Sequence, residues 1–182
     1  ARPGASSFVT DYRDTLELLA QHRARALEKH PNLAEAEVVI PPLTSEVLEE
    51  TGAFIEGCWK TTYGNRPRIS FGADFLRFAL CDEETPGIIT WVRMNGVLVS
   101  ALLGFPVTFR MPGCIRRGVI SSGLTTHPDH RGQGFADWAR IVQLEAVIAR
   151  GYDCTIQFFN LAHQQAGSSY KEWGRRYSEY QS

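Results

Sequence analysis

The sequence has few cysteines, and they are not arranged for metal binding or for a disulfide framework. Cys58, Cys81, Cys114 and Cys154 stand singly, without a C-x-x-C pair and without histidines at the spacing of zinc ligands. We therefore expect no metal site. We also expect the four cysteines to be reduced core residues of a cytoplasmic protein.

Long apolar runs and an excess of charge of one sign are absent as well. The longest apolar runs are far shorter than the roughly 20 residues that a membrane span requires. The N-terminus also lacks the apolar stretch of a signal peptide. The net charge is −1 and the composition is 43% hydrophobic, as in ordinary soluble domains. The sequence therefore predicts neither a membrane partner nor a nucleic-acid partner.

The length of 182 residues suits one compact domain. We divide it into a lead-in with an appended helix, residues 1–37, and a main domain, residues 38–182. The helix is expected over Phe8 to His30, because apolar residues recur there at three- and four-residue spacing. Its expected packing stripe consists of Leu16, Leu19, Ala20, Arg23, Ala24 and Leu27. The chain starts with Ala1 rather than Met, which is typical of an excised or processed piece.

The middle of the chain has the pattern of an antiparallel meander that follows two helices. The strongest local signal is Asn95-Gly96, a pair typical of the tightest β-hairpin turns. The patterning predicts a strand at Val38–Ile40, a helix from Thr44 or Ser45 to about Trp59, a second helix near Ala73–Cys81, and strands at Ile88–Met94, Val97–Phe109 and Val119–Thr126.

The second half of the chain alternates strand, helix and strand. A helix from about Gln133 to Arg150 separates the strand ending at Thr126 from a strand at Cys154–Phe159. Two strands joined by a helical crossover are usually parallel neighbours, which we expect here. A last helix is expected over about Ala162 to Trp173. The stripe expected to cover the sheet consists of Phe135, Trp138, Val142, Ala146 and Ala149.

Two glycines lie at the junction between the strand that ends at Thr126 and the helix that follows it. Without Cβ atoms, Gly132 and Gly134 let backbone N–H groups approach an anion closely. The helix dipole adds about half a positive charge at that end. Arg131 supplies a guanidinium fork that can hold a phosphate by two hydrogen bonds. The sequence therefore predicts a diphosphate site, while His127 and His130 are expected to be structural or to face solvent.

The run from Leu124 to Ala136 resembles the acetyl-CoA signature of the GNAT superfamily. That signature has an apolar strand, then a His-Pro or similar turn, and then the pattern Gln/Arg-x-x-Gly-x-Gly/Ala, where x is any residue. A second match follows, because His163, Ala166, Tyr170 and Gly174 fall on the last-helix pattern of the family, with His in place of Asn. The resemblance implies an α/β (α+β) fold with a mixed, mostly antiparallel central sheet and flanking helices.

The resemblance also implies an acyltransferase that uses acetyl-CoA or another acyl-CoA, whose thioester carbonyl is attacked directly by a substrate amine. Tyr170 matches the general acid that protonates the departing thiolate. The strand residues would pair with pantetheine, and the loop amides would bind the pyrophosphate. The implied cofactor-binding residues are Leu124, Thr125, Thr126, Arg131, Gly132, Gln133, Gly134, Phe135 and Ala136.

The sequence departs from the family pattern near the expected reaction centre. Many members carry an acidic base on the central strand, but residues 119–123 contain no carboxylate. His163 and Thr126 replace the usual Asn and Val, so both become catalytic candidates. Together with Trp59 they are similar to the GNAT-like loading domains of polyketide synthases, which decarboxylate malonyl-CoA and pass acyl groups to a carrier-protein thiol. A module that binds acyl-CoA or a partner without catalysis is the third alternative.

The C-terminus and the acceptor side are less defined. The family adds two strands after the last helix, whereas this sequence stops at Ser182. We expect those strands to be missing or to be supplied by a partner, such as a second copy in a dimer. The aromatic residues that are candidates to line the acceptor pocket are Trp59, Tyr63, Phe71 and Phe75.

Overall fold

The computed structural model describes residues 13–64 and 70–157. Residues 8–12 of the expected first helix, residues 158–159 of the expected last strand, and the expected helix 162–173 lie outside the described residues. The elements are α1 (Arg13–Lys29), η1 (Pro31–Glu35), β1 (Glu37–Val39), α2 (Ser45–Tyr63), α3 (Ala73–Leu80), β2 (Ile88–Met94), β3 (Val97–Met111), β4 (Cys114–Thr126), η2 (Pro128–His130), α4 (Phe135–Ala149) and β5 (Cys154–Gln157).

Within the described residues, five strands form one mixed sheet in the order β1-β2-β3-β4-β5. The first four are antiparallel neighbours, and β5 runs parallel to β4. The meander and the parallel pair are therefore both confirmed. The β2–β3 turn has positive φ at Asn95 (51°) and Gly96 (78°), as the tightest hairpin turns require.

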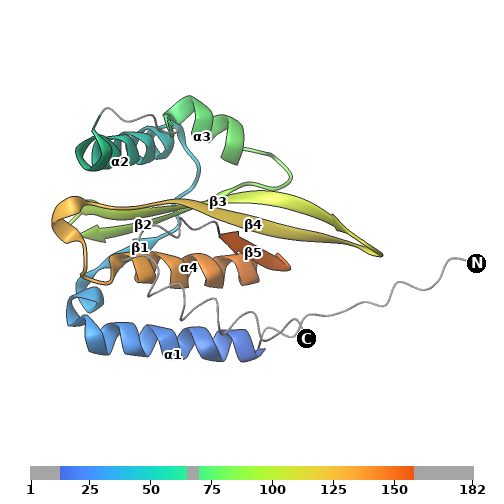
Figure 1. The fold of residues 1–182 in the computed structure, drawn as a ribbon, viewed down its shortest axis with the longest axis horizontal. Helices are drawn as coiled ribbons and strands as arrows, with labels where there is room; N and C mark the ends of the chain where they lie inside the picture. Colours follow the sequence, from blue (N-terminus) through green and yellow to red (C-terminus); the bar gives the residue numbers. More distant parts are fainter. Residues whose placement is uncertain (1–12, 65–69, 158–182) are drawn as a thin grey trace, which may run out of the picture.

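The sheet lies between two layers of helices (Figure 1). Helices α2 and α3 cover one face, α4 covers the other, and α1 lies on the outer side of α4. Arg23 of α1 joins these two helices, because its Nη2 donates to Glu145 Oε2 over 2.9 Å and its guanidinium lies 5.2 Å from the Trp138 ring centre. The expected appended helix thus packs on α4 rather than on the sheet.

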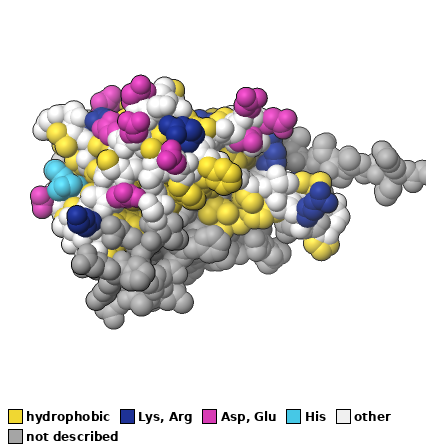
Figure 2. All heavy atoms as spheres, turned by 90° about the horizontal axis from the view of Figure 1, so that it is seen from above, with side chains coloured by type: hydrophobic (Ala, Val, Ile, Leu, Met, Phe, Trp, Pro, Cys, Tyr) yellow, Lys and Arg dark blue, Asp and Glu magenta, His cyan; other side chains and the backbone are white. Residues whose placement is uncertain are grey.

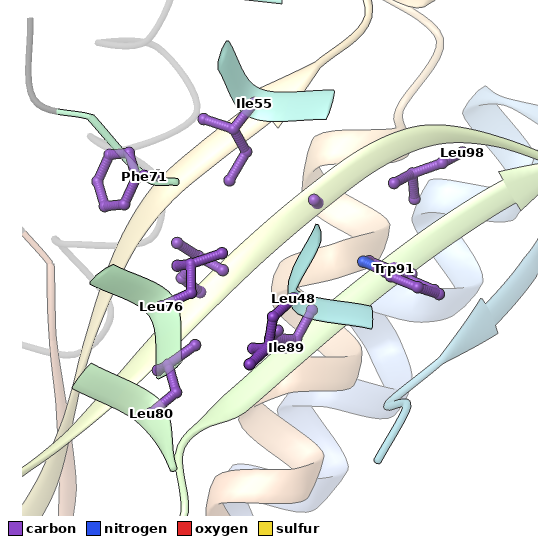
Figure 3. Close-up of a cluster of buried hydrophobic side chains, with 10 residues drawn as sticks. Leu48, Ile55, Phe71, Leu76, Leu80, Ile89, Trp91 and Leu98 are labelled. Atoms are coloured by element: carbon purple, nitrogen blue, oxygen red, sulfur yellow. The ribbon is translucent and has the colours of Figure 1, made fainter. Parts of the chain in front are cut away.

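The larger core cluster fills the space between α2, α3 and the sheet (Figure 3). Leu48 and Ile55 project from α2, and Leu76 and Leu80 from α3, toward the side chains of β2 and β3. The Trp91 indole is buried with them, and its N–H donates to Thr51 Oγ1 over 3.0 Å. A buried indole that finds a partner fixes how α2 sits on the sheet.

The burial of α4 differs from the predicted stripe. Phe135 and Trp138 are buried as expected, but Val142 and Ala146 are only partly buried and Ala149 is exposed. The residues that are buried instead are Ala139, Arg140, Ile141, Gln143 and Val147. Since α4 is covered by the sheet on one side and by α1 on the other, its buried surface is wider than one stripe.

The predicted stripe of α1 is also partly wrong. Leu19 is fully buried and Leu27 is partly buried, but Leu16 is 46% exposed and Ala20 and Ala24 are exposed. The packed face includes Ala26, which contacts the cluster around Phe135. The helix is therefore rotated so that Leu16, Ala20 and Ala24 lie beside its contact line with α4.

All four cysteines were expected in the core, but three of them do not lie there. All four thiols are free, but only Cys58 is buried. Cys81 directly follows α3, Cys114 begins β4 at the hairpin turn, and Cys154 begins β5, so each lies at or beside the end of an element. Among the described helices, none is long and apolar enough to cross a membrane.

Candidate functional site

Strand β4 has an open edge beside the predicted cofactor site. Strand β5 pairs with β4 over Gly118–Ser121, and within the described residues nothing pairs with that edge beyond Ser121. A β-bulge sits at the same place, where Gly123 has φ 64° and the register to β3 shifts. Residues 124–126, which were predicted to pair with pantetheine, therefore lie on an edge of β4 to which no strand of the described part of the chain pairs.

Residues 127–134, the anion loop, lead from this edge to α4. The first backbone N–H of the loop, on His127, donates to Val99 O over 2.9 Å, and the short η2 helix follows. Gly132 and Gly134 then adopt φ 76° and 84°. Both glycines of the predicted motif thus take left-handed conformations that other residues adopt only with strain.

The loop ends at the N-terminus of α4, which supplies the donors for an anion. The first backbone hydrogen bond of the helix runs from Trp138 N to Gly134 O over 3.0 Å. The N–H groups of Phe135, Ala136 and Asp137 precede it, and a helix cannot satisfy such groups internally. Gly134 offers no side-chain cap. The arrangement suits an oxyanion such as phosphate.

The two loop glycines have different surroundings. A Cβ atom on Gly132 would meet nothing within 4 Å, so this position is open to a ligand. A Cβ on Gly134 would lie 2.7 Å from His30 Cδ2 and 3.1 Å from Leu33 Cδ1. The segment after α1, which was predicted to belong to the lead-in region, therefore packs against the anion loop.

Arg131 contacts α2. Its Nη2 donates to Thr62 Oγ1 over 2.6 Å, and the side chain is exposed. The sequence predicts that α2 ends near Trp59, whereas the helix continues to Tyr63, so Thr62 was not among the predicted site residues. Thr62 and Arg131 are 69 positions apart, so their contact can be recognised only in the folded structure.

The two histidines of the loop contact their neighbours within it. His127 Nδ1 accepts from Asp129 N over 3.4 Å and so caps η2. The His130 ring lies 5.8 Å from the ring of His127 and 6.0 Å from that of Phe135. These contacts hold the turn that precedes Gly132.

The two threonines at the end of β4 bond on opposite faces of the sheet. Thr125 is buried, and its Oγ1 accepts from the Trp59 indole of α2 over 2.9 Å. Thr126 Oγ1 lies 3.0 Å from Ser100 Oγ. Since neighbouring strand residues alternate in direction, Thr126 points away from the face that α2 covers. Trp59 therefore pairs with Thr125 and not with the catalytic candidate Thr126.

The aromatic residues suggested for the acceptor pocket form a row beside this site. The ring centre of Trp59 lies 6.1 Å from that of Tyr63 and 5.2 Å from that of Phe71. The ring centres of Phe71 and Phe75 are 5.6 Å apart. Figure 2 looks onto this side of the molecule and shows hydrophobic side chains exposed among acidic ones. The row begins at the bond between Trp59 and Thr125 and ends at Phe75, which is 40% exposed.

The thiol of Cys58 lies near the same loop. Burial raises the pKa of the Cys58 thiol, and the positive charge of Arg131 opposes this effect. A raised pKa keeps the sulfur protonated at neutral pH, so it is a poor nucleophile. Within residues 13–64 and 70–157, no three His, Cys, Asp or Glu side chains gather as a possible metal site.

The structure brings together the anion loop, the edge of β4 and the end of α2. Two of the predicted catalytic residues, His163 and Tyr170, lie outside the described residues. The contacts that the sequence did not predict are those of Thr62 with Arg131, Trp59 with Thr125, and His30 with Gly134.

Comparison of the sequence finds no matching family pattern and no matching curated protein. Comparison of the structure finds solved acetyltransferases. A ribosomal-protein-alanine N-acetyltransferase from Brucella melitensis biovar Abortus 2308 is similar over 75% of this chain and 89% of its own, with 16% identity and a TM-score of 0.56.

Two further structures are similar to comparable extents. An aminoglycoside acetyltransferase from an uncultured soil metagenomic sample, in complex with sisomicin, matches 78% of this chain and 88% of its own, with 8% identity and a TM-score of 0.61. A "predicted acetyltransferase with acetyl-CoA" from Clostridium acetobutylicum matches 76% and 88%, with 12% identity and a TM-score of 0.60. The chain therefore has the GNAT fold, as the sequence resemblance implied.

Proposed function

We propose that this chain is an acyltransferase that moves an acetyl or other short acyl group from acyl-CoA to an amine. The observation that carries the proposal is the anion loop, where Gly132 and Gly134 take positive φ directly before the N-terminus of α4, whose first-turn N–H groups precede the first helical hydrogen bond. The position of the loop supports the proposal further, because it follows a stretch of β4 to which no strand within residues 13–64 and 70–157 pairs on that edge. A diphosphate at the loop would leave the pantetheine arm free to run along that edge.

In the proposed reaction the amine nitrogen attacks the thioester carbonyl, a C–N bond forms and the C–S bond breaks. The departing thiolate takes a proton from the Tyr170 phenol, and His163 is the proposed base for the amine. Thr126 is proposed to bond the acyl group through its hydroxyl. Its present bond to Ser100 fixes that hydroxyl on the α4 face of the sheet.

A Tyr170→Phe variant tests the proposed acid. We expect turnover to fall by about tenfold, because a thiolate is a moderately basic leaving group that water can also protonate. The affinity for acetyl-CoA should stay within about twofold of the wild type, since the phenol acts only on the leaving group. Steady-state kinetics and calorimetry measure the two quantities separately. Full turnover in the variant would remove Tyr170 from the mechanism.

The choice of reaction is tested with acetyl-CoA and malonyl-CoA, each offered with a panel of amines and with a carrier-protein thiol. Free thiol release together with an acylated amine is the expected result. Release of CO2 from malonyl-CoA with acylation of the carrier would instead support the polyketide-loading alternative. Binding of acyl-CoA without either product would support a non-catalytic binding module.

A further inference from the structure

We infer that Thr62 is a positioning residue for the anion loop, because its hydroxyl holds the Arg131 guanidinium against the end of α2. The inference rests on the proposed function, since it assumes that the loop receives the diphosphate of acyl-CoA. It assigns Arg131 a role in fixing the loop as well as in binding phosphate. Thr62 itself needs no contact with the ligand.

The hydrogen bonds around Thr62 have a defined direction. Its Oγ1 donates to Cys58 O over 2.8 Å, so the hydroxyl proton is already engaged within α2. The lone pairs of the same oxygen are then free to accept from Arg131 Nη2 over 2.6 Å. Thr62 lies in the last turn of α2, where the helix dipole favours a cation. Both the hydroxyl and the helix end therefore stabilise the guanidinium at this place.

The loop needs such a restraint because of its glycines. Arg131 directly precedes Gly132, whose surroundings are open, and glycine has the most backbone freedom of all residues. The far end of the loop is fixed by the packing of Gly134 against His30 and Leu33. The contact between Arg131 and Thr62 fixes the near end. With both ends held, the loop amides keep one arrangement before the ligand arrives.

Helix α2 also holds the strand that leads into the loop. Trp59 lies three residues before Thr62, so both side chains project from one side of the helix. Its indole donates to Thr125 Oγ1 over 2.9 Å. One helix thus braces β4 and the anion loop through two separate hydrogen bonds.

The guanidinium has enough donors for both roles. Arg131 carries five N–H groups in a planar fork, and the contact with Thr62 uses one nitrogen. A phosphate can therefore bind to other N–H groups while Thr62 stays bonded. If Arg131 instead had to leave Thr62 to reach the ligand, loss of the hydroxyl would strengthen binding. The two possibilities predict effects of opposite sign.

The test compares Thr62→Val, which removes the hydroxyl at nearly constant shape, with Thr62→Ser, which retains it. Calorimetric titration of the folded variants with CoA is expected to show about five- to tenfold weaker binding for Thr62→Val. Thr62→Ser should bind within about twofold of the wild type. In turnover assays, Thr62→Val should raise the KM for acetyl-CoA and leave kcat nearly unchanged, which a general loss of folded protein would not do.

A double-mutant cycle with Arg131→Ala completes the test. The Thr62→Val change should cost nothing further once the guanidinium is gone, because the two residues act as a unit. Equal or tighter binding of CoA by Thr62→Val, or losses that simply add, would overturn the inference alone. A wild type that does not bind CoA would overturn the proposed function and the inference together. If thermal unfolding shows that Thr62→Val is not folded, Thr62→Ala takes its place in the cycle.

Discussion

A Gly132→Asp variant is expected to bind CoA about a hundredfold more weakly than the wild type, while Gly132→Asn loses far less. Gly132 has φ 76° and an open surrounding, and Asn and Asp are the residues that best tolerate this conformation. The two variants have the same shape, so they differ by one negative charge at the N-terminus of α4. Placing that charge beside a diphosphate at an exposed position costs about 1.4–2.8 kcal/mol, which corresponds to a tenfold to hundredfold loss of affinity. Calorimetry with CoA measures both affinities.

The ratio of the two affinities isolates the electrostatic part of the effect. We expect that ratio to be about tenfold or larger at low ionic strength and to shrink as salt is added, because exposed charges are screened. The melting temperatures of the two variants should be close, since their backbone demands are equal. Identical CoA affinities for Asp and Asn at this position would mean that no anion binds at the loop.

Most of the fold could be predicted because its signals are local. The hairpin turn at Asn95 and Gly96 follows from two adjacent residues that accept positive φ. The start of α2 follows from Thr44, whose Oγ1 accepts from Val47 N over 3.4 Å. The parallel pairing of β4 and β5 follows from the helix between them. None of these conclusions requires knowledge of distant contacts.

The burial of the helices could not be predicted in the same way. A single apolar stripe describes a helix with one covered side, but α4 packs on the sheet and on α1 together. Burial also reaches a polar residue of α4, because Gln143 is almost completely buried against the sheet and its Oε1 accepts from Ser121 Oγ over 2.5 Å. The burial of this polar side chain cannot be predicted from the sequence, because its hydrogen-bond partner lies 22 positions away in β4.

The site shows the same division between local and distant information. The positions of the anion loop and of its two glycines follow from their place between strand and helix. The bulge at Gly123, the contact of Arg131 with Thr62 and the contact of Thr125 with Trp59 depend on the fold. These contacts determine where α2 stands relative to the loop, and therefore which side chains face the region where an acceptor would bind.

The two loop glycines, which lie two residues apart and both have positive φ, should differ sharply in their effect on stability. Gly132→Ala is expected to cost about 1 kcal/mol in free energy of unfolding, because only the strain of a positive φ is added. Gly134→Ala carries the same strain, with φ 84°, and also places its Cβ 2.7 Å from His30 Cδ2. Overpacking of that kind adds a further ~1–3 kcal/mol. Denaturant unfolding of both variants measures the difference.

His30 provides the control for this comparison, because it is the side chain that the new Cβ would meet. Combining His30→Ala with Gly134→Ala should recover part of the lost stability, whereas combining it with Gly132→Ala should give additive losses. Equal costs for the two alanine variants would show that the segment after α1 does not pack on the loop. If Gly134→Ala is the less stable variant, as expected, then weaker CoA binding by a Gly134 variant reflects a disturbed loop as well as a lost ligand contact. Gly132 is therefore the position at which ligand binding can be tested without disturbing the fold.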